Sequence, residues 1–249
     1  MGKIRLILLT ALCLGSLSTL CCAQELRDPA LDHILEKVKA VYGINLHYAE
    51  GPLSKFIDFD YSLADVKDDQ ALKKVILLFV QEISLYPKDF FRDAHCQDIY
   101  LVQKLFYKQK PTDGVFLEST NSIFYDYARD WDNAQKIRHN IHHELYHMIG
   151  SKHPFWKEHG PAWKALNRIG FSYNQIYSRH ERNPINFYAP SEPGFITDYA
   201  MASAEEDRAE MFACIMIPEE LSLMEQWAQK DKILFKKVEM MKEFLKEAF

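Results

Sequence analysis

Residues 141–147 read IHHELYH, so that His143, Glu144 and His147 form the pattern His-Glu-x-x-His. Residues four apart share one face of a helix, with Cβ atoms about 5–6 Å apart, so both imidazoles can reach a single ion. Zinc accepts neutral nitrogen ligands of this kind. Glu144 lies beside such an ion, where it can deprotonate a zinc-activated water and pass the proton to a leaving amine. The stretch predicts a metal-binding helix with a candidate catalytic glutamate.

The flanking residues predict a long helix around this pattern. Asp132 is the expected N-cap, the helix should run through Ile149, and Gly150 is expected to end it. Apolar residues recur at helical spacing and should bury one face: Ile137, Ile141, Leu145 and Met148. His139 and His142 fall on other faces, where we expect surface residues or supports of the metal ligands.

Two residues compete for the place of the third ligand. The extended spacing His143-Glu144-x-x-His147-x-x-Gly150-x-x-His153 matches the metzincin pattern, in which His153 would bind and Met201 would form the Met-turn. The second candidate lies further along the chain.

The acidic stretch at residues 203–210, SAEEDRAE, provides that second candidate. Glu206 and Glu210 are four apart on one helical face, so Glu206 could bind the ion while Glu210 fixes the tautomer of a ligating imidazole. Ser203 and Glu206 also form a capping box, which explains acids at a helix start without any metal. A cation held against this face would offset the repulsion between its four acids.

The pattern along the rest of the chain predicts an α+β fold. Residues 24–249 are expected to form one domain, with a small sheet, the metal-binding helix and a mostly helical C-terminal part. The expected elements are helices at 29–42 and 67–86, strands at 44–48, 99–107 and 115–127 (folded at 119–121), a short helix at 162–167 in a loop-rich stretch, and helices from 203 to 249 interrupted at Pro218.

The first 23 residues have the pattern of a signal peptide. Lys3 and Arg5 precede an apolar run, Leu6–Leu20, and cleavage is expected before Gln24. A run of about 15 residues is shorter than the ~20 that span a bilayer. We expect a secreted or periplasmic protein with no transmembrane span in the mature chain. Lipid attachment through the cysteines at 21–22 is the alternative.

Composition excludes several classes of protein. Hydrophobic residues are 48% and charged residues 26%, as in ordinary globular domains. The formal net charge of −5 leaves no basic footprint for nucleic acid. The expected mature chain keeps Cys96 and Cys214, which either pair or remain as thiols. We expect a monomer that acts on a peptide or protein.

Three segments resemble a known family. Residues 141–149, 194–200 and 206–212 (IHHELYHMI, GFITDYA and EDRAEMF) look like the zinc-binding metallopeptidases common among Bacteroides lipoproteins, and more distantly like the catalytic domain of anthrax lethal factor. These are gluzincins, in which two histidines and a glutamate bind zinc. The resemblance covers roughly residues 110–217. It departs at Arg208, and the chain lacks a typical lipobox.

The resemblance implies roles for particular residues. Glu206 becomes the third ligand and Glu210 the partner of a ligating histidine, and Tyr199 donates its hydroxyl to the oxyanion of the tetrahedral intermediate. His153 matches no ligand of this family. The implied fold is a zincin-like metallopeptidase domain.

The favoured function is therefore an exported zinc metallohydrolase, most consistent with a peptidase that holds one Zn²⁺ per chain. The strand at residues 122–127 is expected to line the cleft and pair with substrate. The main alternative is a non-catalytic secreted binding or scaffold protein that keeps zinc for stability. A metal-free exported helical protein is the third possibility.

Overall fold

The computed structural model describes residues 29–48, 59–63, 70–150, 152–173 and 192–249. The predicted signal peptide at residues 1–23, the cysteines at 21–22 and the expected helix cap Asp28 lie outside these ranges.

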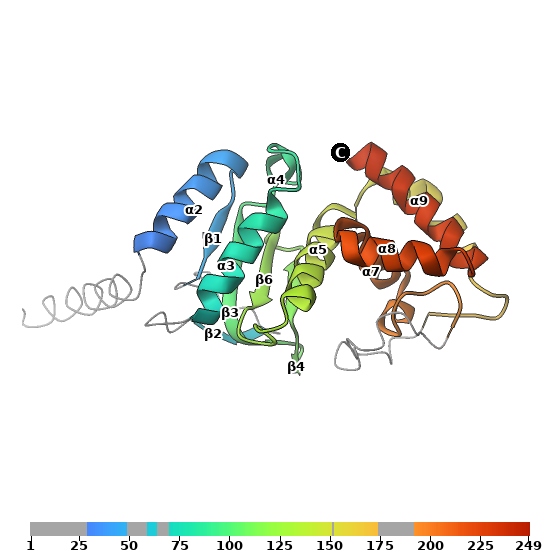
Figure 1. The fold of residues 1–249 in the computed structure, drawn as a ribbon, viewed down its shortest axis with the longest axis horizontal. Helices are drawn as coiled ribbons and strands as arrows, with labels where there is room; N and C mark the ends of the chain where they lie inside the picture. Colours follow the sequence, from blue (N-terminus) through green and yellow to red (C-terminus); the bar gives the residue numbers. More distant parts are fainter. Residues whose placement is uncertain (1–28, 49–58, 64–69, 151, 174–191) are drawn as a thin grey trace, which may run out of the picture.

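A small mixed sheet forms the N-terminal half of the molecule (Figure 1). Its two central strands, β3 (Asp98–Tyr107) and β6 (Ser122–Asp126), run parallel. On one side β1 (Asn45–His47) is parallel to β3, and on the other β5 (Gly114–Leu117) is antiparallel to β6. Two further strands pair antiparallel with the end of β3: β2 (Phe59–Ser62) and β4 (Lys110–Pro111).

The predicted fold-back within residues 115–127 is confirmed. β5 and β6 form a hairpin whose last register pair is Leu117 with Ser122. Asn121 has φ +51°, a left-handed conformation that asparagine tolerates better than most residues. Its side chain donates a hydrogen bond to the carbonyl of Ala94 at 2.9 Å, which ties the turn to the neighbouring segment.

Helices cover one face of the sheet. α2 (Pro29–Tyr42), α3 (Gln70–Ile83) and α5 (Ala134–Gly150) lie side by side across it (Figure 1). Their apolar faces and the facing side chains of β3 and β6 form the main core. α4 (Phe90–Asp93) is a single turn between α3 and β3. The helices predicted at residues 29–42 and 67–86 are thus confirmed over their described parts.

The C-terminal part is helical, as predicted. Its elements are α6 (Pro154–Ala165), the 3₁₀ turn η3 (Tyr199–Met201), α7 (Ala204–Met216), α8 (Pro218–Ala228) and α9 (Lys232–Ala248). The predicted break at Pro218 is present, and Asp231 adds a second one by capping α9 through the backbone N–H groups of Ile233 and Leu234. α5 lies between this part and the sheet, because it packs on α3 and β5 on one side and on α7 on the other.

The short helix predicted at residues 162–167 is wrong in extent. α6 begins at Pro154, whose fixed φ and missing N–H suit the first helical position. Pro161 lies inside the helix, one residue before the predicted start. Trp156 and Trp163 on this helix are buried in the core, and their burial offsets the lost hydrogen bond.

The two cysteines that remain in the expected mature chain do not pair. Cys96 and Cys214 are both free and buried. Within the part of the chain that the structure describes, no helix combines the length and apolar character needed to cross a bilayer.

Candidate metal centre

The metal-binding pattern lies in the middle of α5, where the helix is buried. The N-cap of α5 is Asn133 rather than the predicted Asp132, since Asn133 Oδ1 accepts a hydrogen bond from the N–H of Lys136 at 3.0 Å. His143 and Glu144 are almost inaccessible, at 0% and 1% exposure. The ring of His147 retains some exposure. One side of the helix therefore offers a nearly enclosed pair of imidazoles.

Three ligand atoms from two helices converge beside α5. His143 Nε2 and His147 Nε2 are 3.0 Å apart. Glu206 Oε2, from the first turn of α7, is 3.0 Å from the first nitrogen and 3.3 Å from the second. Ligand atoms bound at about 2.0–2.1 Å to a tetrahedral ion are separated by roughly 3.3–3.4 Å. The three groups therefore have nearly the spacing that one zinc ion requires.

The charges at this point also suit a cation. Glu206 Oε2 is buried and makes no hydrogen bond within the described part of the chain. Burial alone would raise the pKa of the Glu206 carboxyl, but His147 and His143 hold it well below its ordinary value. Burial would lower the pKa of His147, yet Glu206 and Glu205 raise it to about 10. A metal ion bound here would take the place of the proton on His147 as the positive charge that pairs with the Glu206 carboxylate.

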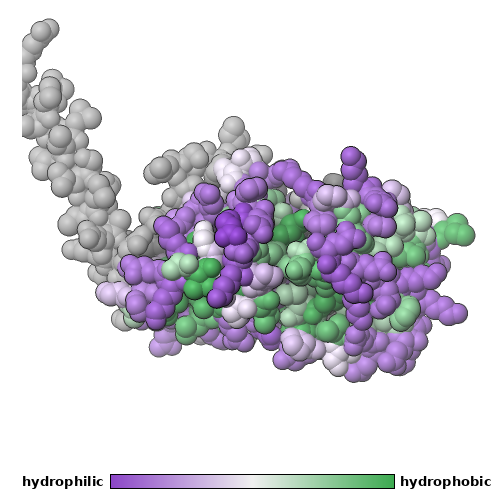
Figure 2. Space-filling view, turned by 90° about the horizontal axis from the view of Figure 1, so that it is seen from above, coloured by the Kyte–Doolittle hydropathy of each residue, from purple (hydrophilic) through white to green (hydrophobic). Residues whose placement is uncertain are grey.

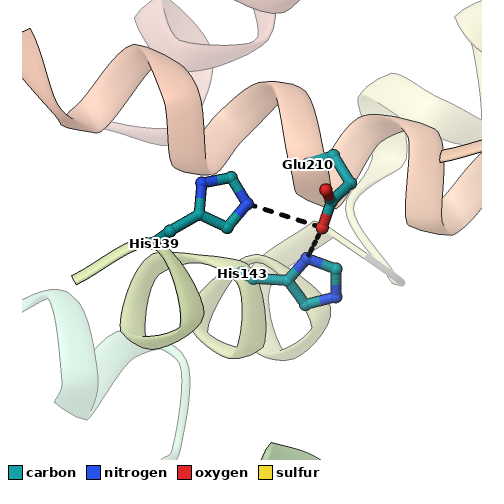
Figure 3. Close-up of side chains that lie close together, drawn as sticks. All are labelled: His139, His143 and Glu210. Carbon is teal, nitrogen blue, oxygen red and sulfur yellow. Dashed lines mark ion pairs between the residues drawn. The ribbon is translucent and has the colours of Figure 1, made fainter. Parts of the chain in front are cut away.

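Glu210 supports His143 from behind. Its Oε1 is 2.8 Å from His143 Nδ1, and its Oε2 accepts a hydrogen bond from Thr197 Oγ1 at 2.8 Å. Figure 3 shows Glu210 reaching down from α7 between two histidines of α5. A carboxylate on Nδ1 leaves Nε2 free to bind an ion.

His139 extends this buried network beyond Glu210. Its Nε2 is 3.4 Å from Glu210 Oε1 (Figure 3), and its Nδ1 is 2.7 Å from Glu220 Oε2 on α8. Although burial opposes the charge, Glu220 and Glu210 raise the pKa of His139 to about 9. The surface alternative for His139 is therefore wrong: the residue is 1% exposed and joins α8 to the metal helix.

His142 is likewise buried rather than on the surface. Its Nε2 is 2.9 Å from Glu82 Oε2 on α3, and its Nδ1 is 2.7 Å from the hydroxyl of Tyr86. Arg138 donates to the other oxygen of Glu82 at 2.7 Å. Sequence reasoning missed Glu82 and Glu220, because a glutamate within a helix gives no sign of a partner that lies far away in the sequence.

Glu144 contacts the sheet through β5. Its Oε2 accepts a hydrogen bond from the N–H of Phe116 in β5 at 3.1 Å. Gly114, two residues earlier on β5, leaves the room that the carboxylate occupies, since a Cβ there would lie 2.7 Å from Glu144 Cγ. The fit between strand and helix places Glu144 at the side of the ligand cluster.

The strand expected to pair with substrate is not available. β6 lies inside the sheet between β3 and β5, and all its residues are buried. The prediction for residues 122–127 is therefore wrong, because a strand paired on both sides has no edge at which a peptide could add. β5 is the strand at the edge of the described sheet, and it is the one that contacts Glu144.

Tyr199 lies next to the cluster and is partly exposed. Its ring centroid is 5.9 Å from that of His143. Thr197, which also holds Glu210, accepts a hydrogen bond from the N–H of Ala200 at 3.1 Å and so fixes the turn that carries Tyr199. The loop leading to this turn is held by Lys237, whose Nζ donates to the carbonyl of Gly194 at 2.9 Å.

The competing metzincin residues lie elsewhere. His153 is the N-cap of α6, where its Nδ1 accepts a hydrogen bond from the N–H of Phe155 at 3.3 Å, and its ring packs against Phe244. It belongs to none of the His, Cys and acid groups within ligand distance of one another in the described residues. Met201 is buried against Phe195. The geometry favours Glu206 over His153.

The remaining residues of the acidic stretch have structural partners. Ser203 Oγ accepts a hydrogen bond from the N–H of Glu206 at 3.1 Å, as in a helix cap. Asp207 Oδ2 is 2.7 Å from Lys237 Nζ, and both side chains are fully buried. Arg208 donates to the carbonyl of Ala204 at 2.9 Å and lies over the ring of Trp156. Within the acidic stretch, Glu206 is the residue with an oxygen atom within 3.3 Å of both His143 Nε2 and His147 Nε2.

An α+β fold whose central helix carries two histidines and a glutamate, and in which a second glutamate on a later helix completes a group of three ligands, defines the class of zincin-like metallopeptidase domains. The chain belongs to the family described as "Putative zinc-binding metallo-peptidase", whose model matches residues 30–249. It is similar to the crystal structure of a putative zinc-binding metallo-peptidase from Bacteroides caccae, with a TM-score of 0.56 and 19% identity over 87% of this chain and 84% of that one. At this identity the likeness concerns the fold. A comparison with curated proteins finds no match.

Proposed function

We propose that the protein is an exported, monomeric metallopeptidase that holds one zinc ion per chain between His143, His147 and Glu206. The observation that carries the proposal is the convergence of their three ligand atoms to 3.0–3.3 Å, beside a buried glutamate that is not one of them. Family membership supports zinc and a peptide substrate.

Each residue around the ligands has its own proposed role in hydrolysis. Zinc, when bound, supplies a Lewis acid that makes water nucleophilic near neutral pH. Glu144 accepts the proton of the attacking water and transfers it to the leaving amine. Tyr199 donates a hydrogen bond to the carbonyl oxygen as negative charge develops there. Glu210 holds His143 in the tautomer and orientation that ligation needs.

The edge strand β5 is the proposed guide for the substrate backbone. An extended peptide that adds to the edge of a sheet gains backbone hydrogen bonds regardless of its sequence. Because Phe116 in β5 contacts Glu144 directly, a peptide aligned on this strand brings one of its carbonyl groups to the general base. Support for this role comes from the position of β5 at the sheet edge.

Metal content tests the ligand set. We expect about one zinc in the purified protein and in the His153→Ala variant, and none in Glu206→Ala. Retention in Glu206→Ala together with loss in His153→Ala would replace this site by the metzincin arrangement. No zinc in any of the three after reconstitution would remove the metal from the proposal.

Turnover tests the catalytic role separately. Glu144→Gln keeps the size and shape of the side chain but removes the base, so we expect normal zinc content and loss of peptide cleavage. Cleavage is followed by mass spectrometry of a peptide library. A variant that retains its activity, or a wild-type protein that binds zinc but cleaves nothing, would favour the non-catalytic binding or scaffold function.

Export rests on the N-terminal pattern alone. Lys3, Arg5 and the apolar run Leu6–Leu20 have the composition that translocation signals require. The N-terminus of the protein recovered from the producing cells should be Gln24. A lipid-modified cysteine at 21 or 22 would instead indicate an anchored form, and an unprocessed Met1 would contradict export.

A further inference from the structure

A cavity of about 550 Å³ lies at the C-terminal end of α5. It is enclosed by α4, by the last turn of α5 and by the last residues of α9, three elements that meet along the upper side of the molecule (Figure 1). Seen from that side, hydrophobic surface gathers in the middle of the face between two hydrophilic regions (Figure 2). The apolar lining includes Phe90, Phe116, Met148, Ile149 and Phe249.

The cavity adjoins the candidate general base through two residues. Phe116 donates its backbone N–H to Glu144, and its side chain forms part of the cavity wall. Met148 also lines the cavity and lies one helical turn beyond Glu144 on the same face of α5. A group bound in the cavity would therefore lie close to Glu144, because Phe116 contacts both and Met148 is one helical turn from Glu144.

We propose that this cavity is a specificity pocket for a large hydrophobic side chain, aromatic above all, of a peptide extended along β5. The inference rests on the proposed peptidase function and adds the substrate class. The volume lies within the range of pockets that bind whole side chains or small ligands. Because the floor is aromatic and aliphatic, it discriminates by the apolar area of the side chain that it buries.

The rim of the cavity bears charges of both signs. Asp89 and Asp93 stand on the side of α4, and Lys152 pairs with Glu118 at 2.8 Å across the opening. These groups are solvated and partly neutralise one another. Arg92 lies 2.6 Å from Asp89 Oδ1 and 3.7 Å from Asp93 Oδ1, so each carboxylate named on the rim has a cationic neighbour, and hydrophobic area remains the main basis of selection.

Binding tests the pocket without depending on turnover. The probe is a set of fluorescent octapeptides of Ala, Gly and Ser in which a single Phe occupies each position in turn, and the protein is zinc-loaded Glu144→Gln. We expect Phe at one position to bind about 10- to 100-fold more tightly than Ala there. Fluorescence anisotropy gives the dissociation constants.

Filling the cavity should remove this preference. Ala248 lines the cavity, whereas its neighbour Glu247 is exposed and does not. Ala248→Trp should reduce the preference for Phe to within about twofold, while the matched control Glu247→Trp should keep it. Ala94→Leu fills the cavity from the α4 side and serves as the second variant. Zinc content and circular dichroism identify any variant that fails to fold.

The outcomes separate the pocket from the proposed function. No preference for Phe at any position, or a preference that survives both Ala248→Trp and Ala94→Leu, overturns the pocket even if the wild type cleaves peptides. A preference that both substitutions abolish supports the pocket. If the wild type then cleaves none of these peptides, the peptidase function is wrong and the pocket remains a peptide-binding site.

Discussion

Gly114 is the residue whose missing side chain matters most to the candidate site. A methyl group there would lie 2.7 Å from Glu144 Cγ and 3.1 Å from Glu144 Oε1. Since carbon atoms do not approach this closely without strain, either β5 or Glu144 must shift. The glycine therefore belongs to the proposed catalytic geometry although it carries no functional group.

We predict that Gly114→Ala lowers kcat/KM for peptide cleavage by roughly 100-fold, because a displacement of about 1 Å in a catalytic group costs this much. Zinc content should not change, since Gly114 touches none of the ligands. Gly160→Ala is the control: a Cβ there meets only Arg208 Nη1, at 3.9 Å. Equal activities of the two variants would show that the close approach has no role in catalysis.

Glu210 leads to a second prediction at this scale. Its carboxylate is fully buried, and its Oε1 lies 2.8 Å from His143 Nδ1. Glu210→Gln preserves the shape but weakens the orienting interaction, so zinc affinity should fall about 10- to 100-fold. Competition with a chelating dye measures the affinity. The exposed Glu219→Gln should bind zinc as the wild type does, and a Glu210→Gln affinity equal to that value would refute the orienting role.

Among the elements, α9 is joined to α7 by a buried ion pair. Lys237 Nζ contacts Asp207 Oδ2, which also accepts hydrogen bonds from Trp163 at 2.9 Å and Tyr173 at 2.7 Å. Burial raises the pKa of Asp207 and lowers that of Lys237, and each partner opposes the shift of the other. The buried carboxylate of Asp207 on α7 is therefore linked to Lys237 on α9, to Trp163 on α6 and to Tyr173.

Lys237→Met should reduce the free energy of unfolding by about 3–5 kcal/mol, because it leaves a buried carboxylate without its cation. Urea denaturation monitored by circular dichroism measures the change. Lys236→Met, on the exposed side of the same helix, should stay within about 0.5 kcal/mol of the wild type. The double variant Lys237→Met with Asp207→Leu should recover most of the loss, and failure to recover it would mean that the ion pair is not the cause.

Local sequence patterns predicted most of the helices and strands correctly. They did not predict which residues far apart in the sequence contact each other. The helical spacing of Leu72, Val75 and Phe79 marked α3 correctly, because an amphipathic helix repeats within its own sequence. The hairpin of β5 and β6 followed from a polar turn between two apolar runs. α6 was shortened in the prediction, because residues 151–198 were interpreted as rich in loops and prolines, whereas Pro154 begins the helix and Pro161 lies within it.

In the candidate site, too, the residues that share one helix could be predicted from the sequence, whereas their partners on other elements could not. The spacing of His143, Glu144 and His147 is a local property of one helix, and the structure places them accordingly. Spacing alone left the third ligand open between His153 and Glu206. Only the packing of α7 against α5 brings Glu206 to the imidazoles, and the order of β5 and β6 in the sheet likewise depends on contacts that no periodicity records.

At the scale of the whole molecule, the candidate metal centre lies between α5 and α7, and these two helices pack on each other without the help of a metal ion. α5 and α7 make an extensive apolar contact, and the main core lies outside the site. We therefore predict that the protein stays folded after zinc is removed by a chelator, but that its thermal midpoint falls. Free zinc at a hundredfold excess over Kd contributes about 2.7 kcal/mol.

For a chain of this size that stabilisation corresponds to a shift of roughly 5–10 °C. Differential scanning calorimetry with and without the chelator measures it. Glu206→Ala should show no dependence on chelator, because it has lost a ligand. Complete unfolding of the wild type on chelation would contradict the prediction and would make zinc a requirement for the fold.

The position of Glu206 on α7, after α5 and α6, also bears on when the protein can become active during its synthesis. A ribosome that has produced only the sheet and α5 has made both histidines and the general base, but no third ligand. Such a nascent chain holds an ion through two groups at best. For the proposed peptidase, hydrolytic activity is thereby confined to chains whose C-terminal helices have been completed and have packed against α5.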